Sequence, residues 1–236
     1  MSLMGETPRE GIENVLTEMK PYDFLHVDEG QRLVTLAQAL LMQVIDDNVK
    51  PVTILISTDQ PGRLANALLK RLQLQVPIGY YSLSELKEIV EVQAKKLDIL
   101  LSPQAAGLVA RVSCGLPRNA EHLLGPLRRR FHASKDQQLT MEDVRTFLRE
   151  SGIAENGLNS WQQSYLRYLA DVGVAAVESL ALHLGVDVDY VRSQIEPPLL
   201  REKLIKITPR GRQTTELGNR WIAETNGSLG KEETNG

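Results

Sequence analysis

The sequence predicts an α/β segment followed by a chain that is mostly α-helical. Two short apolar runs, at residues 23–27 and 52–57, are each followed by a stretch with helical spacing, which is the pattern of a parallel α/β sheet. From residue 80 onwards, apolar residues recur at helical intervals, and a strand–turn–strand pattern appears only at residues 205–215. Aromatic residues make up 5% of the chain, so the core must consist mainly of Leu, Val, Ile and Ala.

The composition excludes several classes of protein. The net charge is −3 and the pI about 5.9, so the chain has no overall basic field, and any nucleic-acid site must be a local patch. Cys114 is the single cysteine, which excludes a disulfide framework. No run of 18 apolar residues and no apolar leader segment is present. These features predict a cytoplasmic protein.

The first segment, residues 5–79, contains the expected α/β elements. Thr7, Pro8 and Glu10 predict the start of a helix that runs to about Met19. The first strand follows at 23–27. Helical spacing returns at 32–45, the second strand lies at 52–57, and a further helix is predicted at 61–72.

Residues 80–152 predict a compact helical segment. Ser82 with Glu85, and Thr140 with Asp143, have the spacing of an N-terminal cap and its partner. The pair Ser102-Pro103 predicts another helix start, and Gly115 with Pro117 a helix end and restart. We expect four helices here, followed by a linker at 152–159.

Residues 159–223 predict a winged helix-turn-helix module. Helices are expected at 160–172, 175–184 and 187–204, then two short strands joined by a turn that contains Arg210, Gly211 and Arg212. Two arginines at an exposed hairpin tip suit contacts with DNA phosphates or the minor groove, with 187–204 as the recognition helix. That helix also carries acidic residues, so a wing used only for protein contacts is the alternative. Residues 224–236 are polar and expected to be disordered.

Two further clusters suggest phosphate chemistry. Asp28 and Glu29 end the first strand, where an aspartate can hold Mg²⁺ and a glutamate can orient water for phosphoryl transfer. The alternative is a solvated acidic strand end. Arg118, beside Pro117 at a helix start, is placed to bind phosphate, and a plain helix junction with a surface arginine is the alternative.

Taken in order, these features resemble RuvB, the bacterial Holliday-junction branch-migration motors of the AAA+ class, over roughly residues 5–222. The run Phe24-Leu25-His26-Val27-Asp28-Glu29 resembles the family's Walker B strand, and residues 52–58 its sensor-1 strand, with Thr58 in the sensor position. Arg71 falls on the arginine finger and Arg118 on sensor 2. Thr208-Pro209-Arg210-Gly211-Arg212 is similar to the family's wing.

The sequence departs from the family at three places. The Gly-rich loop that ends in Gly-Lys-Ser/Thr and cradles the phosphates does not occur in these residues. The family's long hairpin, which docks on its partner RuvA, has no counterpart at residues 46–51. Gly30-Gln31 stands where the family usually has Ile-His.

The resemblance therefore implies an incomplete AAA+ α/β half, a helical lid and a C-terminal winged helix. It implies a RuvB-like Holliday junction DNA helicase in truncated or degenerate form, which binds DNA through the winged helix and does not hydrolyse ATP alone. ATP and Mg²⁺ enter only through the resemblance, and RuvA docking is not expected. DNA, an intact AAA+ motor and a second copy of the chain are the expected partners.

The alternatives are a non-enzymatic DNA-binding or adaptor protein, and a fragment of a complete motor. The reduced sheet is expected to expose strand edges and apolar faces, so this segment either rearranges or is covered by another chain.

Overall fold

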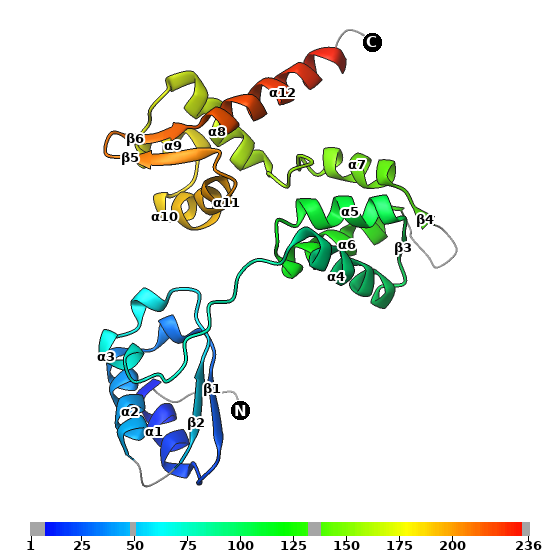
Figure 1. Cartoon of the computed structure of the whole chain (residues 1–236). Coiled ribbons are helices and arrows are strands. Elements are labelled where there is room, and N and C mark those ends of the chain that lie inside the picture. Colours follow the sequence, from blue (N-terminus) through cyan, green and yellow to red (C-terminus); the bar gives the residue numbers. More distant parts are fainter. Residues whose placement is uncertain (1–7, 48–50, 132–137, 233–236) are drawn as a thin grey trace. The chain divides into compact units, whose positions relative to one another are not determined.

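The computed structural model describes residues 8–47, 51–131 and 138–232. The chain divides into two compact units at the junction of Ile78 and Gly79. Figure 1 shows the elements of each unit. None of the described helices is long and apolar enough to span a membrane.

The first unit is a pair of parallel strands with helices on one side. Its elements, in chain order, are α1 (Pro8–Glu18), β1 (Phe24–Val27), the 3₁₀ turn η1 (Gly30–Arg32), α2 (Thr35–Asp46), β2 (Thr53–Ile56), the 3₁₀ turn η2 (Pro61–Arg63) and α3 (Asn66–Leu69). The strands pair in parallel, with Phe24 opposite Thr53 and Val27 opposite Ile56. Leu25 and Ile54 pack toward a core formed by residues such as Leu41 and Leu68.

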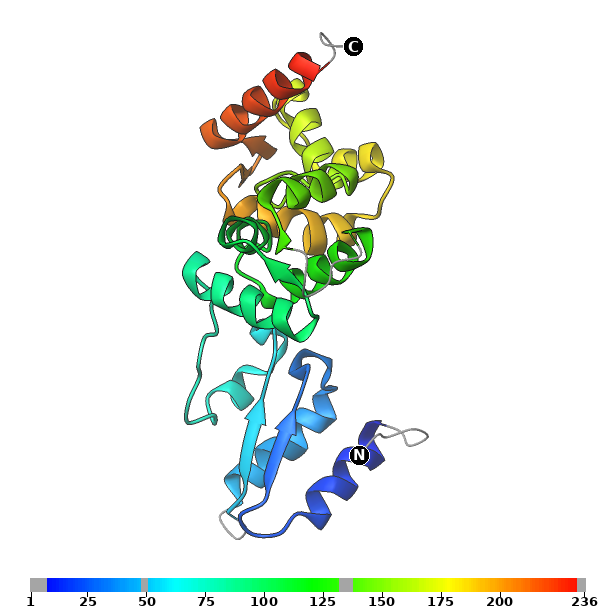
Figure 2. The same ribbon diagram turned by 90° about the vertical axis from the view of Figure 1, so that its right-hand side faces the viewer.

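The other face of these strands is exposed, as expected for a reduced sheet. Phe24 is 62% exposed and Leu55 is 50% exposed, and both lie on the face away from the core. Parallel strands are normally covered on both faces. Figures 1 and 2 show α1 and α2 on one side of the strand pair only.

The predicted helix at 61–72 is wrong. The chain instead forms η2 and the four-residue α3, separated by an extended Leu64 and Ala65. The side chain of Gln38 on α2 stabilises this break, because its Oε1 accepts the Ala65 N–H at 2.7 Å. The extended turn directs both Leu64 and Leu68 into the core.

The second unit begins with a helical subdomain. It contains α4 (Leu83–Lys96), β3 (Leu100–Leu101), α5 (Pro103–Val112), α6 (Pro117–Phe131), β4 (Gln138–Leu139) and α7 (Met141–Glu150). The predicted N-terminal caps are confirmed: Ser82 with Glu85, and Thr140 with Asp143, each form reciprocal capping boxes. A core of its own lies between the helices, centred on residues such as Val90, Val109 and Leu124.

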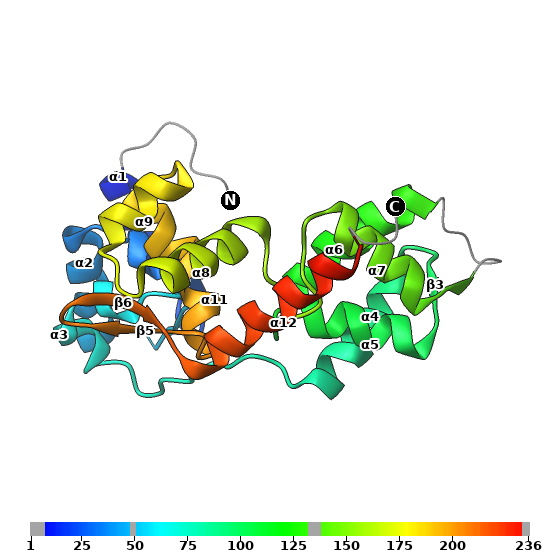
Figure 3. The ribbon, with the colours of Figure 1, turned by 90° about the horizontal axis from the view of Figure 1, so that it is seen from above.

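The second unit continues as a winged helix. Its elements are α8 (Ser160–Val172), α9 (Val177–Leu184), α10 (Val188–Tyr190), the π-helical turn η3 (Val191–Ile195), α11 (Glu196–Arg201), β5 (Ile205–Thr208), β6 (Gly211–Thr214) and α12 (Glu216–Glu232). Strands β5 and β6 form an antiparallel hairpin, and β6 contacts both α8 and α12, as Figure 3 shows. The winged helix has a separate hydrophobic core, which contains buried residues such as Tyr165, Leu180 and Leu199.

The C-terminal helix runs further than the sequence predicts. The composition predicts disorder from residue 224, but α12 continues to Glu232, so this expectation is wrong for residues 224–232. Trp221 and Ile222 pack against the winged-helix core and anchor the helix, and adding residues to an existing helix costs little compared with nucleating it. Residues 233–236 lie outside the described part of the chain.

Direct contacts join the helical subdomain to the winged helix. The guanidinium of Arg201, at the end of α11, lies 4.5 Å from the centre of the Tyr80 ring, just before α4. The thiol of Cys114, in the turn before α6, donates to the carbonyl of Asn156 at 3.4 Å. The helical subdomain is therefore tied both to the linker and to the end of α11.

Candidate functional site

Asp28, directly after β1, takes part in a chain of hydrogen bonds with Ser57 and His26. The Ser57 hydroxyl, just after β2, donates to Oδ1 of Asp28 at 2.7 Å, and His26 Nε2 lies 2.9 Å from the same hydroxyl. The Ser57 hydrogen bond, helped by the Glu29 backbone N–H, holds the pKa of Asp28 below its ordinary value. Because Ser57 gives its only hydrogen to Asp28, it must accept from His26, so this trio does not form an activated serine nucleophile.

Glu29 and Thr58 are linked by Gln31. The Gln31 amide donates to Oε2 of Glu29 at 2.6 Å and accepts from the Thr58 hydroxyl at 2.7 Å. Glu29 itself has a left-handed backbone, with φ of 55°, and its carboxylate lies 3.7 Å from Nε of Arg32. The structure therefore brings Asp28, Glu29 and Thr58 together at the strand ends.

Gly30 allows the two strand ends to approach. It is buried, and a Cβ at this position would lie 2.5 Å from Cγ2 of Ile56. Its N–H donates to the Ser57 carbonyl at 2.8 Å. The Gly30-Gln31 departure from the family pattern is therefore the feature that connects the acid pair to Thr58.

Arg71 lies elsewhere in the first unit. Its Nε donates to both carboxylate oxygens of Asp46 at 2.9 Å, and Nη1 donates to the Ala67 carbonyl at 2.9 Å. Asp46 ends α2, whereas the acid pair precedes that helix, so the two sites are separated by the length of a 12-residue helix, about 18 Å. The RuvA-docking prediction concerns this same connection, and residues 48–50 of it lie outside the described part of the chain.

The residues that the resemblance assigns to ATP and Mg²⁺ at the strand ends already have hydrogen-bond partners within the chain. Mg²⁺ is held by carboxylates together with phosphate oxygens and water in octahedral geometry. Asp28 already accepts from Ser57, and Glu29 is engaged by Gln31. Within the described ranges, no group of three or more His, Cys, Asp or Glu side chains could hold a metal ion.

Arg118 and Pro117 lie in the second unit at the start of α6. Pro117 is the first residue of that helix, and the Arg118 side chain is exposed. Gly115 in the preceding turn has φ of 77°, and its carbonyl accepts the Tyr81 N–H at 3.0 Å. This arrangement leaves Arg118 accessible for an anion and fixes the turn that carries it.

The wing tip is a two-residue turn with Arg210 exposed. Thr208 pairs with Gly211, which leaves Pro209 and Arg210 as the loop. The Thr208 hydroxyl accepts the Arg210 N–H at 3.2 Å and donates to the Gly211 carbonyl at 2.8 Å. The turn therefore carries the exposed side chain of Arg210 at its end.

Arg212 does not lie at the exposed tip, and that expectation is wrong. Its side chain is 15% exposed, and its Nε lies 2.8 Å from Oε1 of Glu196, which is 3% exposed. Nη2 approaches the second carboxylate oxygen at 3.3 Å, and the Tyr165 hydroxyl donates to Oε1 at 2.9 Å. Burial, followed by the proximity of Glu196, raises the pKa of Tyr165, so its hydroxyl stays protonated as a donor.

A π-helical turn is what directs Glu196 inward. The sequence predicts one helix over 187–204, but the structure interrupts it with η3 just before Glu196-Pro197-Pro198. Neither proline can donate a backbone N–H, so the carbonyls one turn earlier lose their α-helical partners and the helix widens. Glu196 is then buried beneath the wing instead of facing solvent with Asp189.

Both sites are organised by residues to which the sequence assigns no role. Ser57 and Gln31 connect the strand ends, and Glu196 and Tyr165 hold Arg212. The Pro197-Pro198 pair is a sign in the sequence that the recognition helix is not regular. No local pattern marks Ser57, and Gln31 stands out only as a departure from the family's usual residues.

Comparison with protein-family models places one match on the last part of the chain. Residues 155–223 match the RuvB C-terminal winged helix domain. This range covers α8 to β6 and reaches into α12.

Curated relatives align with most of the chain. The RuvB subunit of the Holliday junction branch migration complex from Thermotoga maritima is 27% identical over 223 residues, which cover 86% of this chain and 67% of that protein. The corresponding subunit from Mycoplasmopsis pulmonis is 29% identical, covering 88% and 72%. That from Anaeromyxobacter sp. strain Fw109-5 is 30% identical, covering 85% and 65%.

Solved structures show the same similarity. The Thermotoga maritima RuvB Holliday junction branch migration motor superposes with a TM-score of 0.78 at 27% identity, covering 92% of this chain and 75% of that one. A point mutant of the same motor gives a TM-score of 0.79 with the same identity and coverage.

Proposed function

The chain is a RuvB-type protein, and on that premise we propose that it binds DNA through its wing as a component of Holliday junction branch migration. The observation that supports this most is Arg210, which stands exposed at the tip of a hairpin held rigid by its neighbours. A guanidinium carried by a hydrogen-bonded turn at a wing tip suits a phosphate, and phosphate contacts position a DNA-binding domain without reading the base sequence. The relatives that support the proposal are named as subunits of a Holliday junction branch migration complex.

Arg212 contributes to this function indirectly. Its guanidinium is engaged by the buried Glu196, so it supports the wing and leaves Arg210 as the phosphate contact. The tip of the wing offers a single exposed arginine, so we expect the tip to contribute few phosphate contacts for each chain and the binding to be weak and to fade with salt. An intact AAA+ motor or a second copy would supply further contacts through effective concentration.

The chain by itself does not hydrolyse ATP under this proposal. The sequence holds no Gly-Lys-Ser/Thr phosphate loop, and the carboxylates of Asp28 and Glu29 are engaged by Ser57 and Gln31. Thr58, Arg71 and Arg118 occupy the positions of the family's sensor 1, arginine finger and sensor 2, but the proposal gives them no catalytic role in this chain. Docking on RuvA is not part of the proposal, because the hairpin that would make it has no counterpart in the sequence at 46–51.

Fluorescence anisotropy on duplex and four-way DNA at several salt concentrations tests the DNA contact. Arg210→Ala is expected to weaken binding to both DNA substrates equally. It should also reduce the steepness of log K against log salt concentration by about one unit, since each phosphate contact contributes about 0.9. Arg128→Ala removes the same charge from the exposed end of α6 and is the matched control. If Arg210→Ala binds as tightly and with the same slope as the wild type, the wing is a protein-interaction module instead.

A further inference from the structure

An open groove lies on the helical subdomain. It has a volume of about 650 Å³, within the usual range of a small-ligand pocket, and is lined from three helices and the connector after α7. Its floor is largely apolar, with Leu108 buried beneath it and Leu83 53% exposed at one wall. Neither Arg118 nor the wing lines this groove.

Gly107 opens the floor of the groove. It lies in the middle of α5, where a glycine weakens a helix relative to alanine. A Cβ added there would meet nothing within 4 Å, so no internal contact requires the missing side chain. A glycine in a helix that faces open space permits close approach of another backbone.

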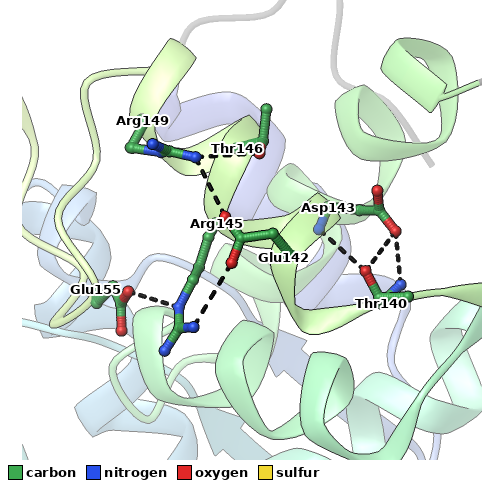
Figure 4. A network of polar contacts seen from close by, with 7 residues as sticks. All are labelled: Thr140, Glu142, Asp143, Arg145, Thr146, Arg149 and Glu155. Carbon is green, nitrogen blue, oxygen red and sulfur yellow. Dashed lines mark hydrogen bonds and ion pairs between the residues drawn. The ribbon is translucent and has the colours of Figure 1, made fainter. Parts of the chain in front are cut away.

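The rim of the groove carries cations. Lys87, Arg111 and Arg145 line it, against the single acid Glu155. Figure 4 shows that Arg145 is already held, because its Nε donates to Oε1 of Glu155 at 2.8 Å and its Nη1 lies 3.6 Å from Glu142. The ammonium of Lys87 lies 3.9 Å from Oε1 of Glu91, and the Arg111 side chain is exposed.

Figure 4 also shows the polar contacts along the wall formed by α7. Arg149 bonds Glu142 and Thr146 along the same helix, and the Thr140–Asp143 capping box fixes its start. The groove is therefore a preformed surface with two cations available to an outside molecule.

We propose that this groove docks an amphipathic helix of a partner protein. Small apolar side chains of that helix would pack over Gly107 and Leu108, while its carboxylates would reach Lys87 and Arg111. The apolar floor disfavours a nucleic acid, whose phosphates need polar or cationic surroundings. The cationic rim is complementary to an acidic helix and would repel a basic one.

Two designed peptides of about 14 residues test the proposal by anisotropy with the full chain. Both carry Ala and Leu on one helical face; one is flanked by Glu and the other by Lys. The acidic peptide is expected to bind at least about tenfold more tightly than the basic one. Gly107→Leu should abolish this binding, and Arg111→Glu should weaken it severalfold.

Two controls separate loss of docking from loss of folding. Arg129→Glu makes the same charge change on α6, outside the groove, and should bind the acidic peptide like the wild type. Gly107→Ala should raise the melting temperature, because alanine is a better helix former than glycine and its Cβ would meet nothing within 4 Å.

Failure of the acidic peptide to bind, equal binding of both peptides, or unchanged binding by Gly107→Leu would each overturn the proposal. Light scattering of the chain alone distinguishes another occupant. If Gly107→Leu converts a dimer into a monomer, the groove belongs to a second copy. Competition by duplex DNA for the acidic peptide would assign the groove to nucleic acid.

Discussion

Arg212 on β6 forms a buried ion pair with Glu196 on α11, with 2.8 Å between Nε and Oε1. The pair connects the wing to the recognition helix, and the Tyr165 hydroxyl adds α8 to the same carboxylate. Ala175, just before α9, exchanges backbone hydrogen bonds with Arg212 in both directions. The position of the wing is therefore fixed from three helical segments.

Arg212→Ala should destabilise the winged helix by about 3 kcal/mol, because it leaves the Glu196 carboxylate buried and unpaired. Urea unfolding followed by Trp fluorescence measures the loss. Arg210→Ala, in the exposed turn, should change stability by less than about 0.5 kcal/mol. Replacing the whole trio with apolar residues, as Tyr165→Phe, Glu196→Leu and Arg212→Met, should restore much of the loss, because Tyr165→Phe removes the hydroxyl that Glu196 accepts. Equal effects of Arg212→Ala and Arg210→Ala would contradict the assignment.

Gly211→Ala should also destabilise the wing, by about 3 kcal/mol, for a steric reason. Gly211 has φ of 128°, and a Cβ there would lie 2.5 Å from the Ala175 carbonyl oxygen. Gly185→Ala is the matched control, since Gly185 has a left-handed backbone with φ of 69° and ψ of 31° but nothing within 4 Å of the added Cβ. That variant should lose only about 1 kcal/mol from backbone strain. Thermal melts of both variants test whether the contact or the dihedral dominates.

The helical subdomain should lose stability in acid through Glu85. The Ser82 hydroxyl and backbone N–H both donate to this carboxylate and lower its pKa from the ordinary value of 4.5. The folded state thus binds protons less readily than the unfolded chain, so the contribution is complete at neutral pH and is lost as the pH falls through the lowered pKa. Glu85→Gln should therefore reduce the difference in unfolding free energy between pH 7 and pH 3. Glu88→Gln, an exposed carboxylate on the same helix, should leave that difference unchanged.

Local chemistry explains which parts of the fold could be predicted. The Ser82–Glu85 and Thr140–Asp143 caps join residues three positions apart, so their spacing is visible in the sequence. The parallel strand pair and the wing also follow from short patterns of apolar residues and turns. By contrast, the hydrogen bond from the Ala65 N–H to Gln38 joins residues 27 positions apart. It stabilises the break in the helix predicted at 61–72, and no local pattern reveals it.

The same distinction applies to the candidate sites. Asp28, Glu29 and Thr58 could be predicted as neighbours because parallel strands bring their carboxyl ends to one edge. Their actual partners, Ser57 and Gln31, depend on tertiary contacts. Arg210 lies in the two-residue turn, whereas Arg212 lies on β6 and pairs with the buried Glu196, a contact between distant segments that the local sequence does not reveal.

The last prediction concerns ATP. The purified chain should release no phosphate from Mg²⁺-ATP above the buffer rate. Catalysis of phosphoryl transfer depends on preorganised groups that stabilise developing charge, and losing even one such donor typically costs about 3 kcal/mol, or roughly a hundredfold in rate. This sequence lacks the loop amides and lysine that would surround the phosphates. Glu29, the expected water-orienting residue, has a left-handed backbone, and its carboxylate accepts a hydrogen bond from Gln31 at 2.6 Å.

A coupled phosphate-release assay at high protein concentration measures ATP hydrolysis, with Glu29→Gln as the matched control. Activity that is equal in both proteins comes from a contaminant. Steady turnover that Glu29→Gln abolishes would show that the chain, or an assembly of its copies, builds a complete nucleotide site after all.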